Sequence, residues 1–546
     1  MSSGPGAHRP AQAPPKLYIY RLETILDRRH PPPALEAYFD PKEIPKWIDS
    51  CVRLHGEHCS LPEGVPGLRY RPRWLIDVDR LCIVAAEHKD YYAFSYTWGS
   101  DRTFKVNQKN MAGLQKDNML GMPLQELPIA FRHVITLCQR IKQRYLWIDV
   151  LCIISDDKPD QEAHLHNMHS IYANATATII AAGAPVLYGL RGIKGATQPM
   201  ERSPQKPGYL EKWNSRGYAT TLQRDISSHT KRIESTFWAK RAWTYQEHLF
   251  SRRRIILTNE TLSWECHCAI WFENMRALDD IPCRNKKQSV AQMTRDPAVD
   301  DLATHVATYN LRSLTYPEDA LDAFKGVLTS LSPVFEGGFI HGLPVKYFDA
   351  AILWFNEAGL QRRTPRRLET KQDLLPSWSW PAWEGKISFL EFASTNAILK
   401  PIVDWSYRAD SAGTWGMVVD SRSNDEARLD EESLFLTSFN NALFTRPMRA
   451  HFRATEVFDG LQILLDDGAG MLTSSTHIYD EARAKQETYE VVAISELNMG
   501  DETAYNVLWI GWYADTITAF RRGVGRILKS AWPADGDTKR VDLFLA

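Results

Sequence analysis

The sequence predicts an α/β protein with three parts: a domain built on a parallel β-sheet, a helical bridge and a β-rich C-terminal region. Between residues 91 and 184, apolar runs of strand length alternate with segments whose apolar residues recur every three to four positions. This alternation is typical of strands joined by right-handed helical crossovers, which make the strands parallel. From about residue 376 onward, strand patterns dominate. A chain of 546 residues is also too long for one ordinary core.

We divide the chain into four segments. Residues 1–65 are expected to form a leader rich in Pro, Gly and Ala, followed by an N-terminal layer in which residues 44–54 place apolar side chains on one helical face. The leader lacks the apolar stretch of a signal peptide. Residues 66–275 form the α/β domain, residues 276–375 the bridge and residues 376–546 the β-rich region.

Composition narrows the class of protein. The 65 basic and 66 acidic residues leave a formal net charge of -1, which gives no reason to expect a nucleic-acid partner or an acidic membrane surface. The eight cysteines are scattered and several lie in apolar runs, a pattern typical of reduced thiols. No apolar run approaches the roughly 20 residues needed to span a membrane. We therefore expect a cytoplasmic protein without a membrane span.

The elements follow from local patterns of apolar residues. In chain order we expect a strand or hairpin at 73–84, a strand at 91–100, a helix beginning at Pro128, a strand at 145–154, a helix at 161–173, a strand at 176–184, a helix at 241–250 and a hairpin at 253–268. Residues 300–360 are expected to be helical. The expected C-terminal strands are PSWSWPAW, FLTSF, GLQILLDD, YEVVAISE, YNVLWIGWY and ITAFRRGVGRI.

Asp149 lies within the apolar run YLWIDVLCII. An ionised carboxylate in a buried strand is costly unless it is paired or hydrogen-bonded. One interpretation is a structural Asp that is satisfied by backbone amides or by an arginine such as Arg144. The other is a site residue at the carboxyl end of a parallel strand, where open α/β sheets bind ligands. The sequence leaves both interpretations open.

Two further segments carry candidate site residues. Ser95, Tyr96 and Trp98 close the strand YYAFSYTWGS and place hydroxyls and an indole at a loop mouth, although alone they favour ordinary aromatic packing. Trp243 and Glu247 lie four residues apart in RAWTYQEHLFS, and therefore share one face of a helix. Alone, this pair favours a partly buried structural Glu. Together, the three segments indicate a site more specifically than any one of them.

Cys266, His267 and Cys268 have the composition of a metal site but not its spacing. Paired cysteines of zinc sites are usually separated by two to four residues, and four ligands are needed. On a strand, His267 would also point away from the face that the two cysteines share. We therefore predict no metal site. The segment FRRGVGRILK lies among strands without a following helix, and predicts a strand element and not a phosphate loop.

Four ordered segments resemble the fungal heterokaryon-incompatibility (HET) domain: YYAFSYTWGS, YLWIDVLCIISDD, MHSIYANATATIIAAGA and RAWTYQEHLFSRRRIIL. RWLIDV upstream and SLTYPEDALDAFKGVL, LPSWSWPAW and FRRGVGRI downstream also resemble the family. The match identifies residues 66–275 as the HET domain. It implies a cytoplasmic fungal protein of allorecognition or regulated cell death. It also implies a distant similarity to TIR domains, which have a flavodoxin-like parallel sheet.

The resemblance to TIR domains implies an activity. In catalytic TIR domains, a Glu four residues after a Trp, in a Trp-Cys-x-x-Glu pattern, cleaves NAD at the bond between nicotinamide and ribose. Trp243 and Glu247 have this spacing here, with Thr244 at the Cys position. The resemblance therefore implies Glu247 as the catalytic residue. NAD is then a substrate, and no cofactor is expected.

The same comparison makes Ser95, Tyr96, Trp98, Asp149 and Trp243 candidate substrate-binding residues. Trp98 or Trp243 would stack on a ring of the ligand, and Asp149 would orient its second half.

Two alternatives remain open. The first is a non-enzymatic signalling module that self-associates or binds another incompatibility protein, while the β-rich C-terminal region senses the trigger. The second is binding of carbohydrate or another small molecule by the Trp-rich segment PSWSWPAW.

Overall fold

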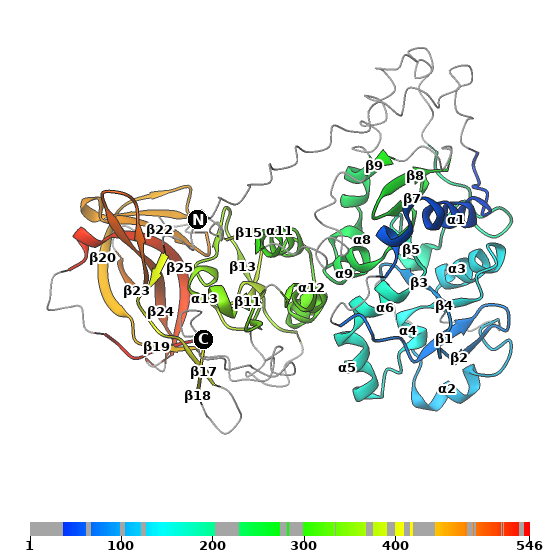
Figure 1. Cartoon of the computed structure of the whole chain (residues 1–546), viewed down its shortest axis with the longest axis horizontal. Coiled ribbons are helices and arrows are strands. Elements are labelled where there is room, and N and C mark those ends of the chain that lie inside the picture. The colour runs from blue at the N-terminus through cyan, green and yellow to red at the C-terminus, as the bar shows by residue number, and fades with distance from the viewer. Residues whose placement is uncertain are drawn as a thin grey trace, which may run out of the picture.

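The computed structural model describes residues 36–61, 67–98, 104–121, 127–202, 229–273, 281–282, 299–333, 335–366, 375–389, 399–408, 415–418, 443–477, 484, 487–514, 516, 518–533 and 540–546. Along the longest axis, Figure 1 shows the α/β domain at one end, the bridge in the middle and the β-rich part at the other end. The predicted α/β fold, with parallel strands at the centre of its sheet and a β-rich C-terminal region, is confirmed. Residues 1–35 of the predicted leader lie outside the described residues.

A nine-stranded sheet forms the centre of the α/β domain, in the order β2-β1-β4-β3-β5-β6-β7-β8-β9. The four middle strands, β4, β3, β5 and β6, are parallel, whereas the strands on both sides pair antiparallel. Every residue of β5 and β6 is buried, as expected of strands covered on both faces. The bounds are β1 Trp74–Asp77, β2 Cys82–Ala85, β3 Tyr92–Ser95, β4 Tyr145–Trp147, β5 Ala177–Ala181, β6 Arg253–Leu257, β7 Leu262–Cys266, β8 Ala269–Phe272 and β9 Ile281–Pro282.

Short helices surround this sheet (Figure 1). In α3, the predicted apolar stripe is buried, because its residues recur at three and four positions and face the core. In α1, Trp47 packs against Trp264 of β7 with 6.4 Å between ring centroids, so the N-terminal layer belongs to the α/β domain. The bounds are α1 Glu43–His55, η2 Gly56–Cys59, α2 Gln108–Leu114, α3 Ile129–Arg140, α4 Asp149–Cys152, α5 Lys158–His166, α6 Met168–Asn174, η3 Val186–Tyr188, α8 Phe237–Lys240 and α9 Trp243–Phe250.

Two predicted elements of the α/β domain are wrong in extent. The apolar run 145–154 is not one strand: β4 ends at Trp147, and the short helix α4 begins at Asp149. Apolar runs of this length do not distinguish a buried strand from a buried helix. The helix predicted at 161–173 is two helices, α5 and α6, because Asn167 leaves the helical conformation with φ -113° and ψ 20°.

The bridge is only partly helical, which corrects the expectation for residues 300–360. It contains the two-residue hairpin turn His341-Gly342, where both φ angles are positive, as hairpin turns of this length prefer. The bounds within the bridge are α11 Val299–Tyr309, η5 Pro317–Ala320, η6 Asp322–Phe324, α12 Lys325–Leu331, β10 Phe339–Ile340, β11 Leu343–Pro344, η7 Val345–Tyr347, α13 Phe348–Ala351, β12 Phe355–Asn356 and β13 Gln361–Arg362. The segment that follows the bridge packs against it and contains η9 Trp380–Ala382, β14 Trp383–Glu384 and β15 Ile387–Ser388, of which β14 pairs with β13 and β15 with β12.

The β-rich part is an 11-stranded sheet in which β20, β21, β22, β25, β24 and β23 pair in a closed ring. The bounds are β16 Leu399–Pro401, β17 Ser406–Arg408, β18 Trp415–Met417, β19 Leu443–Thr445, β20 Met448–Phe458, β21 Gln462–Leu465, η11 Asp466–Gly468, β22 Gly470–Ser474, β23 Thr488–Asn498, β24 Thr503–Trp512, β25 Thr518–Leu528, η12 Lys529–Ala531 and β26 Leu543–Leu545. FRRGVGRI lies in the strand β25, as predicted. FLTSF lies outside the described residues. Among the residues that the structure describes, none of the helices has the length and apolar content needed to cross a membrane.

The segment PSWSWPAW is not the predicted strand. It forms a turn and the 3-10 helix η9, and its tryptophans Trp378, Trp380 and Trp383 are at most 6% exposed. The Trp378 indole N–H donates to the Leu545 carbonyl of β26 at 3.1 Å, so the segment joins the bridge to the β-rich part. This burial removes most of the aromatic surface that a carbohydrate would need.

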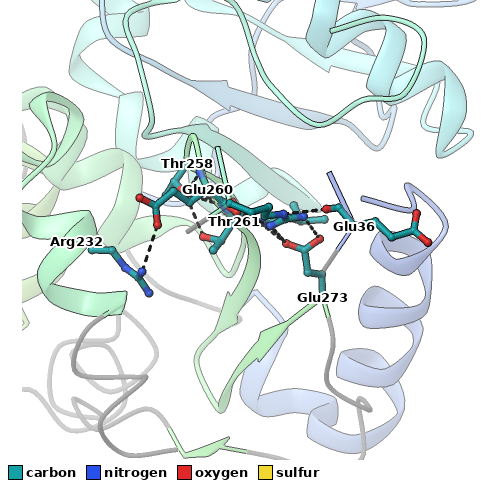
Figure 2. A network of polar contacts seen from close by, with 8 residues as sticks. Glu36, Arg232, Thr258, Glu260, Thr261 and Glu273 are labelled. Atoms are coloured by element: carbon teal, nitrogen blue, oxygen red, sulfur yellow. Dashed lines mark hydrogen bonds and ion pairs between the residues drawn. The ribbon is translucent and has the colours of Figure 1, made fainter. Parts of the chain in front are cut away.

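A polar network ties the N-terminal layer to the turn between β6 and β7 (Figure 2). Arg202 binds both carboxylate oxygens of Glu273, at 2.6 and 2.7 Å, and donates to the Glu36 carbonyl at 2.9 Å. Arg202 also donates to the carbonyl of Glu260, whose carboxylate lies 3.4 Å from Arg232. Bidentate pairs of this kind hold two chain segments in a fixed orientation.

Candidate functional site

The candidate site lies at the edge of the sheet where the parallel strands end. The order β4-β3-β5-β6 means that the chain leaves β3 to one side to form β4, and then crosses to the other side to form β5. Open α/β sheets bind ligands at such switch points, in the crevice outside the carboxyl ends of the strands. In this protein the crevice lies beyond Ser95 at the end of β3 and Ala181 at the end of β5.

A cavity of about 350 Å³ lies between the loops that follow these two strands. The loops are joined by the backbone, because Val186 N–H donates to the Thr97 carbonyl at 3.0 Å. The side chains of Tyr188 and Phe237 are each 77% exposed and form an aromatic rim. The residues that line the cavity are Thr97, Trp98, Pro185, Leu187, Tyr188, Phe237 and Arg241. Aromatic walls with one guanidinium suit a ligand that combines a flat ring with an anionic group.

Ser95 and Glu247 are in direct contact although 152 residues separate them: the Ser95 hydroxyl donates to Glu247 Oε2. The Trp238 indole N–H donates to Ser95 Oγ at 2.7 Å. The Tyr172 hydroxyl donates to the Phe94 carbonyl at 3.5 Å, and its interaction with Glu247 opposes the effect of burial on the pKa of that carboxyl. Glu247 is 8% exposed, and the other three side chains are at most 2% exposed. A carboxyl group with three hydrophobic or hydroxyl-bearing neighbours therefore sits almost out of water.

Burial raises the pKa of Glu247 to about 7, although the Ser95 hydrogen bond and the charge of Arg241 oppose this shift. The neighbouring carboxyl of Asp149 contributes to this rise, since two negative charges repel each other. Near neutral pH, Glu247 is therefore close to half-ionised. General acid–base catalysis requires a carboxyl group poised in this way.

Tyr96 connects Asp149 to the cavity. The Tyr96 hydroxyl donates to Asp149 Oδ1, and the Tyr96 ring lies 5.1 Å from the Trp98 ring, centroid to centroid. Asp149 follows β4 and begins α4, so it stands at the carboxyl end of a parallel strand as the second interpretation expected. Burial raises the pKa of Asp149, and the hydrogen bond from Tyr96 opposes this shift.

Arg241 belongs to both the cavity and the carboxyl cluster. Its guanidinium lines the cavity and donates to the Tyr96 carbonyl at 3.2 Å. Its positive charge opposes the effect of burial on the pKa of Glu247 and of Asp149. An anionic ligand in the cavity would therefore compete with the two carboxylates for the same cation.

Comparison with known proteins assigns this site to a family. Residues 91–247 match the family model described as "Heterokaryon incompatibility protein (HET)", and this range contains every predicted site residue. The chain contains a HET domain at residues 91–247. Heterokaryon incompatibility protein 6, OR allele, of Neurospora crassa is 28% identical to this HET-domain protein over 186 residues. That match covers 29% of this chain and 27% of the relative. No solved structure was found to match the chain.

The HET domain brings most of the predicted site residues together. Ser95 and Glu247 are in contact, as are Tyr96 and Asp149, and Trp98 lines the adjoining cavity. Trp243 lies apart from this cluster, because its indole N–H points to Asp319 of the bridge at 3.4 Å. Trp243 is also not among the residues that line the cavity.

Asp149 accepts a hydrogen bond from a backbone amide, as its structural interpretation expected, but it has no bond to Arg144. The backbone N–H of Val150 donates to Asp149 Oδ1 at 2.8 Å. Arg144 is not its partner, because the Arg144 guanidinium pairs with Asp77 at 3.0 Å.

The bridge fixes the helix α9 that carries Glu247. Thr244, at the Cys position of the TIR pattern, is fully buried, and its hydroxyl lies 2.6 Å from the Trp238 carbonyl. Arg312 of the bridge donates to the Thr244 hydroxyl at 3.2 Å. Gln246 donates to a backbone carbonyl of η6 at 3.1 Å. Thr244 therefore holds the turn before the helix, and nothing in its contacts places it at the cavity.

Several residues of the HET domain that build the site escaped the sequence analysis. Trp238 and Tyr172 contact the Ser95–Glu247 pair, and Tyr188 and Phe237 form the rim of the cavity. Their segments carry ordinary apolar patterns, which gave no signal of a site. Arg241 lies two residues before Trp243 in the sequence, but its position in the cavity wall depends on the fold.

Residues capable of binding a metal gather elsewhere in the HET-domain protein. Cys51, His55, Cys59 and Cys266 have ligand atoms within 4.8 Å of one another. In the sequence, Cys266 stands beside His267 and Cys268, and the spacing of these three residues does not fit a metal site. The signal that could have found the cluster is the spacing Cys-x3-His-x3-Cys at residues 51–59, which places three ligands along successive helical turns.

Proposed function

We propose that this chain is a fungal incompatibility-type protein of allorecognition or regulated cell death, and that its HET domain hydrolyses NAD. The observation that carries the proposal is Glu247, a buried carboxyl group with a pKa of about 7, held at a switch point beside an aromatic cavity. The spacing of Trp243 and Glu247, with its resemblance to catalytic TIR domains, supports the choice of substrate. The name of the Neurospora relative supports the biological process.

The residues of the site have separate roles in this proposal. Arg241 binds the diphosphate, since a guanidinium pairs well with phosphate oxygens. Trp98 and the rim residues Tyr188 and Phe237 stack against a flat ring of the dinucleotide. Asp149, held by Tyr96, orients a ribose. Ser95 positions the carboxylate of Glu247.

The reaction breaks the bond between the nicotinamide nitrogen and the ribose carbon. The ionised Glu247 carboxylate stabilises the positive charge that develops on the ribose, as carboxylates do in glycoside hydrolysis. A water oxygen then bonds to the same carbon, and the products are nicotinamide, ADP-ribose and one proton. Because Glu247 is only 8% exposed, the loops that line the cavity must shift before it touches a ribose. We propose that self-association of the HET domain causes this movement of the loops.

The test compares the wild type with Glu247→Gln over a range of protein concentrations. Nicotinamide released from NAD is measured by chromatography. We expect release to increase more steeply than protein concentration, and to fall at least about 100-fold in Glu247→Gln. Glu260→Gln is the matched control and should keep wild-type activity, because Glu260 does not line the cavity and its carboxylate pairs with Arg232. Equal activity in the wild type and in Glu247→Gln would refute the proposal, as would a wild type that is inert at every concentration.

A second candidate function is a non-enzymatic signalling module. The observation that favours it is the rim of the cavity, where Tyr188 and Phe237 are each 77% exposed and available to a partner surface. In this case Phe237→Glu abolishes toxicity on overexpression in a fungal host, whereas Glu247→Gln keeps it. The NAD hydrolase proposal predicts instead that Glu247→Gln alone is enough to abolish toxicity.

A further inference from the structure

A four-residue cluster of thiols and imidazole lies away from the candidate site, near the amino end of β6, where Cys266 pairs with Arg253. Cys51 and His55 come from α1, Cys59 from η2 and Cys266 from the end of β7. Their ligand atoms all lie within 4.8 Å of one another. The three cysteines are fully buried and His55 is 7% exposed. Four ligand atoms around one point is the number that a structural zinc ion requires.

The local sequence explains how three of these residues converge. Cys51 and His55 lie four residues apart on one face of α1, one turn from each other. Gly56 then adopts φ 48°, a left-handed value that suits glycine, and turns the chain into the 3-10 helix η2. Cys59 thereby returns to the same point. Packing of Trp47 against Trp264 holds α1 on β7, which supplies Cys266.

The distances fit tetrahedral coordination. Zinc lies about 2.3 Å from a thiolate and about 2.0 Å from an imidazole nitrogen, so a tetrahedral site separates sulfur from nitrogen by about 3.5 Å and two sulfurs by about 3.8 Å. His55 Nδ1 lies 3.4 Å from Cys266 Sγ and 3.8 Å from Cys59 Sγ. Little movement is therefore needed to seat the ion.

The surroundings offset the charge of such a site. Three thiolates and one divalent cation leave a net charge of about -1. Arg253, which is 5% exposed, donates from Nε to Cys51 Sγ at 3.4 Å. The backbone N–H of Ala269 donates to Cys266 Sγ at 3.3 Å. A buried guanidinium and an amide directed at the sulfurs are the contacts that stabilise metal-bound thiolates.

We propose that Cys51, His55, Cys59 and Cys266 bind one zinc ion, which fastens the N-terminal helix α1 to the hairpin of β7 and β8. Soft thiolate ligands with one imidazole select zinc over the hard cations magnesium and calcium. Because the protein supplies all four ligands, the ion is structural and leaves no position open for a substrate. The described cysteines are not joined in disulfides, which leaves the thiols available to the metal.

Cys268 is the competing fourth thiol, because its Sγ lies 3.7 Å from Cys59 Sγ. It is partly exposed and does not belong to the group whose ligand atoms all lie within 4.8 Å of one another. We therefore assign Cys266 and not Cys268 as the fourth ligand.

Metal analysis of the purified full-length protein tests the proposal. We expect about one zinc ion per chain in the wild type, and less than about a tenth of that in Cys51→Ser and in Cys266→Ser. Cys138→Ser, which changes a buried cysteine of α3 outside the cluster, is the matched control and should keep the metal. Cys268→Ser should keep it as well. Loss of zinc in Cys268→Ser with retention in Cys266→Ser would overturn the ligand set.

A second measurement uses the wild type alone, and therefore tests the proposal even if the variants fail to fold. The folded wild type is treated with a thiol-specific mercurial, and zinc release is followed with a coloured indicator. We expect release of about one ion per chain with a fall in Tm, and recovery of the Tm when the thiols are regenerated and zinc is restored. A wild type that holds no zinc after purification, and takes up neither Zn²⁺ nor Co²⁺ into a tetrahedral thiolate site, would overturn the proposal. A disulfide among Cys51, Cys59 and Cys266 would overturn it equally.

Discussion

The carboxyl group of Glu247 is both buried and central to the proposed reaction. Its carboxyl is almost out of water, and burial raises its pKa from 4.5 to about 7. In the unfolded chain the group releases its proton near pH 4.5, whereas the folded protein retains it up to about pH 7. The folded state therefore binds more protons in this window, and the stability of the protein falls as pH rises through it.

Glu247→Gln is expected to remove this loss of stability. Glutamine resembles the protonated carboxyl and can still accept the Ser95 hydrogen bond. At pH 8 the variant should be more stable than the wild type by at most about 3 kcal/mol, and the two should be similar at pH 4.5. Urea unfolding at both pH values measures the difference. If the free energies of unfolding of the wild type and of Glu247→Gln differ by the same amount at every pH from 4.5 to 8, folding does not raise the pKa of Glu247 and this prediction is wrong.

At the residue scale, the sequence predicts which side chains matter better than it predicts their partners. The spacing of Trp243 and Glu247 singles out Glu247 because helical neighbours are local. Its partner Ser95 lies 152 residues away, and no local pattern connects them. Trp243 lies outside the cluster because its indole N–H donates to Asp319 of the bridge, and this contact depends on tertiary packing.

The helix α9 is the element on which the site depends. One face carries Glu247 to β3, and the other docks on α12, where Gly326 N–H donates to Gln246 Oε1 at 2.9 Å. A Cβ added at Gly326 would lie 2.3 Å from Gln246 Oε1 and 2.4 Å from His169 Cβ. The close approach of α12 to α6, which carries His169, and to the Gln246 side chain of α9 therefore requires glycine at this position.

Gly326→Ala should displace α12 from α6 and α9 and destabilise the protein by about 1–3 kcal/mol, because overpacking forces a backbone shift. Gly113→Ala is the matched control, since Gly113 is also helical and has no atom within 4 Å of an added Cβ. The control should be neutral or stabilising by up to about 1 kcal/mol. Thermal unfolding compares them. Equal effects of the two substitutions would show that the contact between α9 and α12 does not fix the helix.

Elements with a clear period were predicted well, whereas not every short element was. The stripe of α3 repeats over enough residues to be recognised, whereas β5 and β6 were recognised as short segments of strand length. The run 145–154 predicts one strand because its apolar residues are continuous, so its periodicity gives no sign of the turn into α4 at Asp149.

At the scale of the whole molecule, one strand belongs to two cores. In β23, Val491 and Ala493 face the core of the closed ring of strands, whereas Val492 and Ile494 face the core shared with the bridge. The buried segment around Trp378 continues this second core into the bridge. The sequence predicted β-rich structure here, but not that the Trp-rich segment would be buried, since a ligand-binding surface and an interface share the same composition.

Trp378→Ala should therefore uncouple the β-rich part from the bridge. Trp378 is 1% exposed, and its removal leaves a cavity that costs about 3–5 kcal/mol. Phe458→Ala removes an aromatic side chain of β20 that is 38% exposed, and should change stability by less than about 1 kcal/mol. Calorimetry should show the single transition of the wild type split into two in Trp378→Ala alone. One unsplit transition with an unchanged Tm would contradict this role of Trp378.

The pH dependence of NAD hydrolysis tests the central claim most directly, because it joins the burial of Glu247 to its chemistry. The measurement is kcat/KM for nicotinamide release by the wild type between pH 5 and 9. If the ionised carboxylate is required, kcat/KM rises about tenfold per pH unit below an apparent pKa near 7 and is constant above it. A profile that is flat or falling between pH 5 and 8 would contradict the assignment of Glu247 as the catalytic carboxylate.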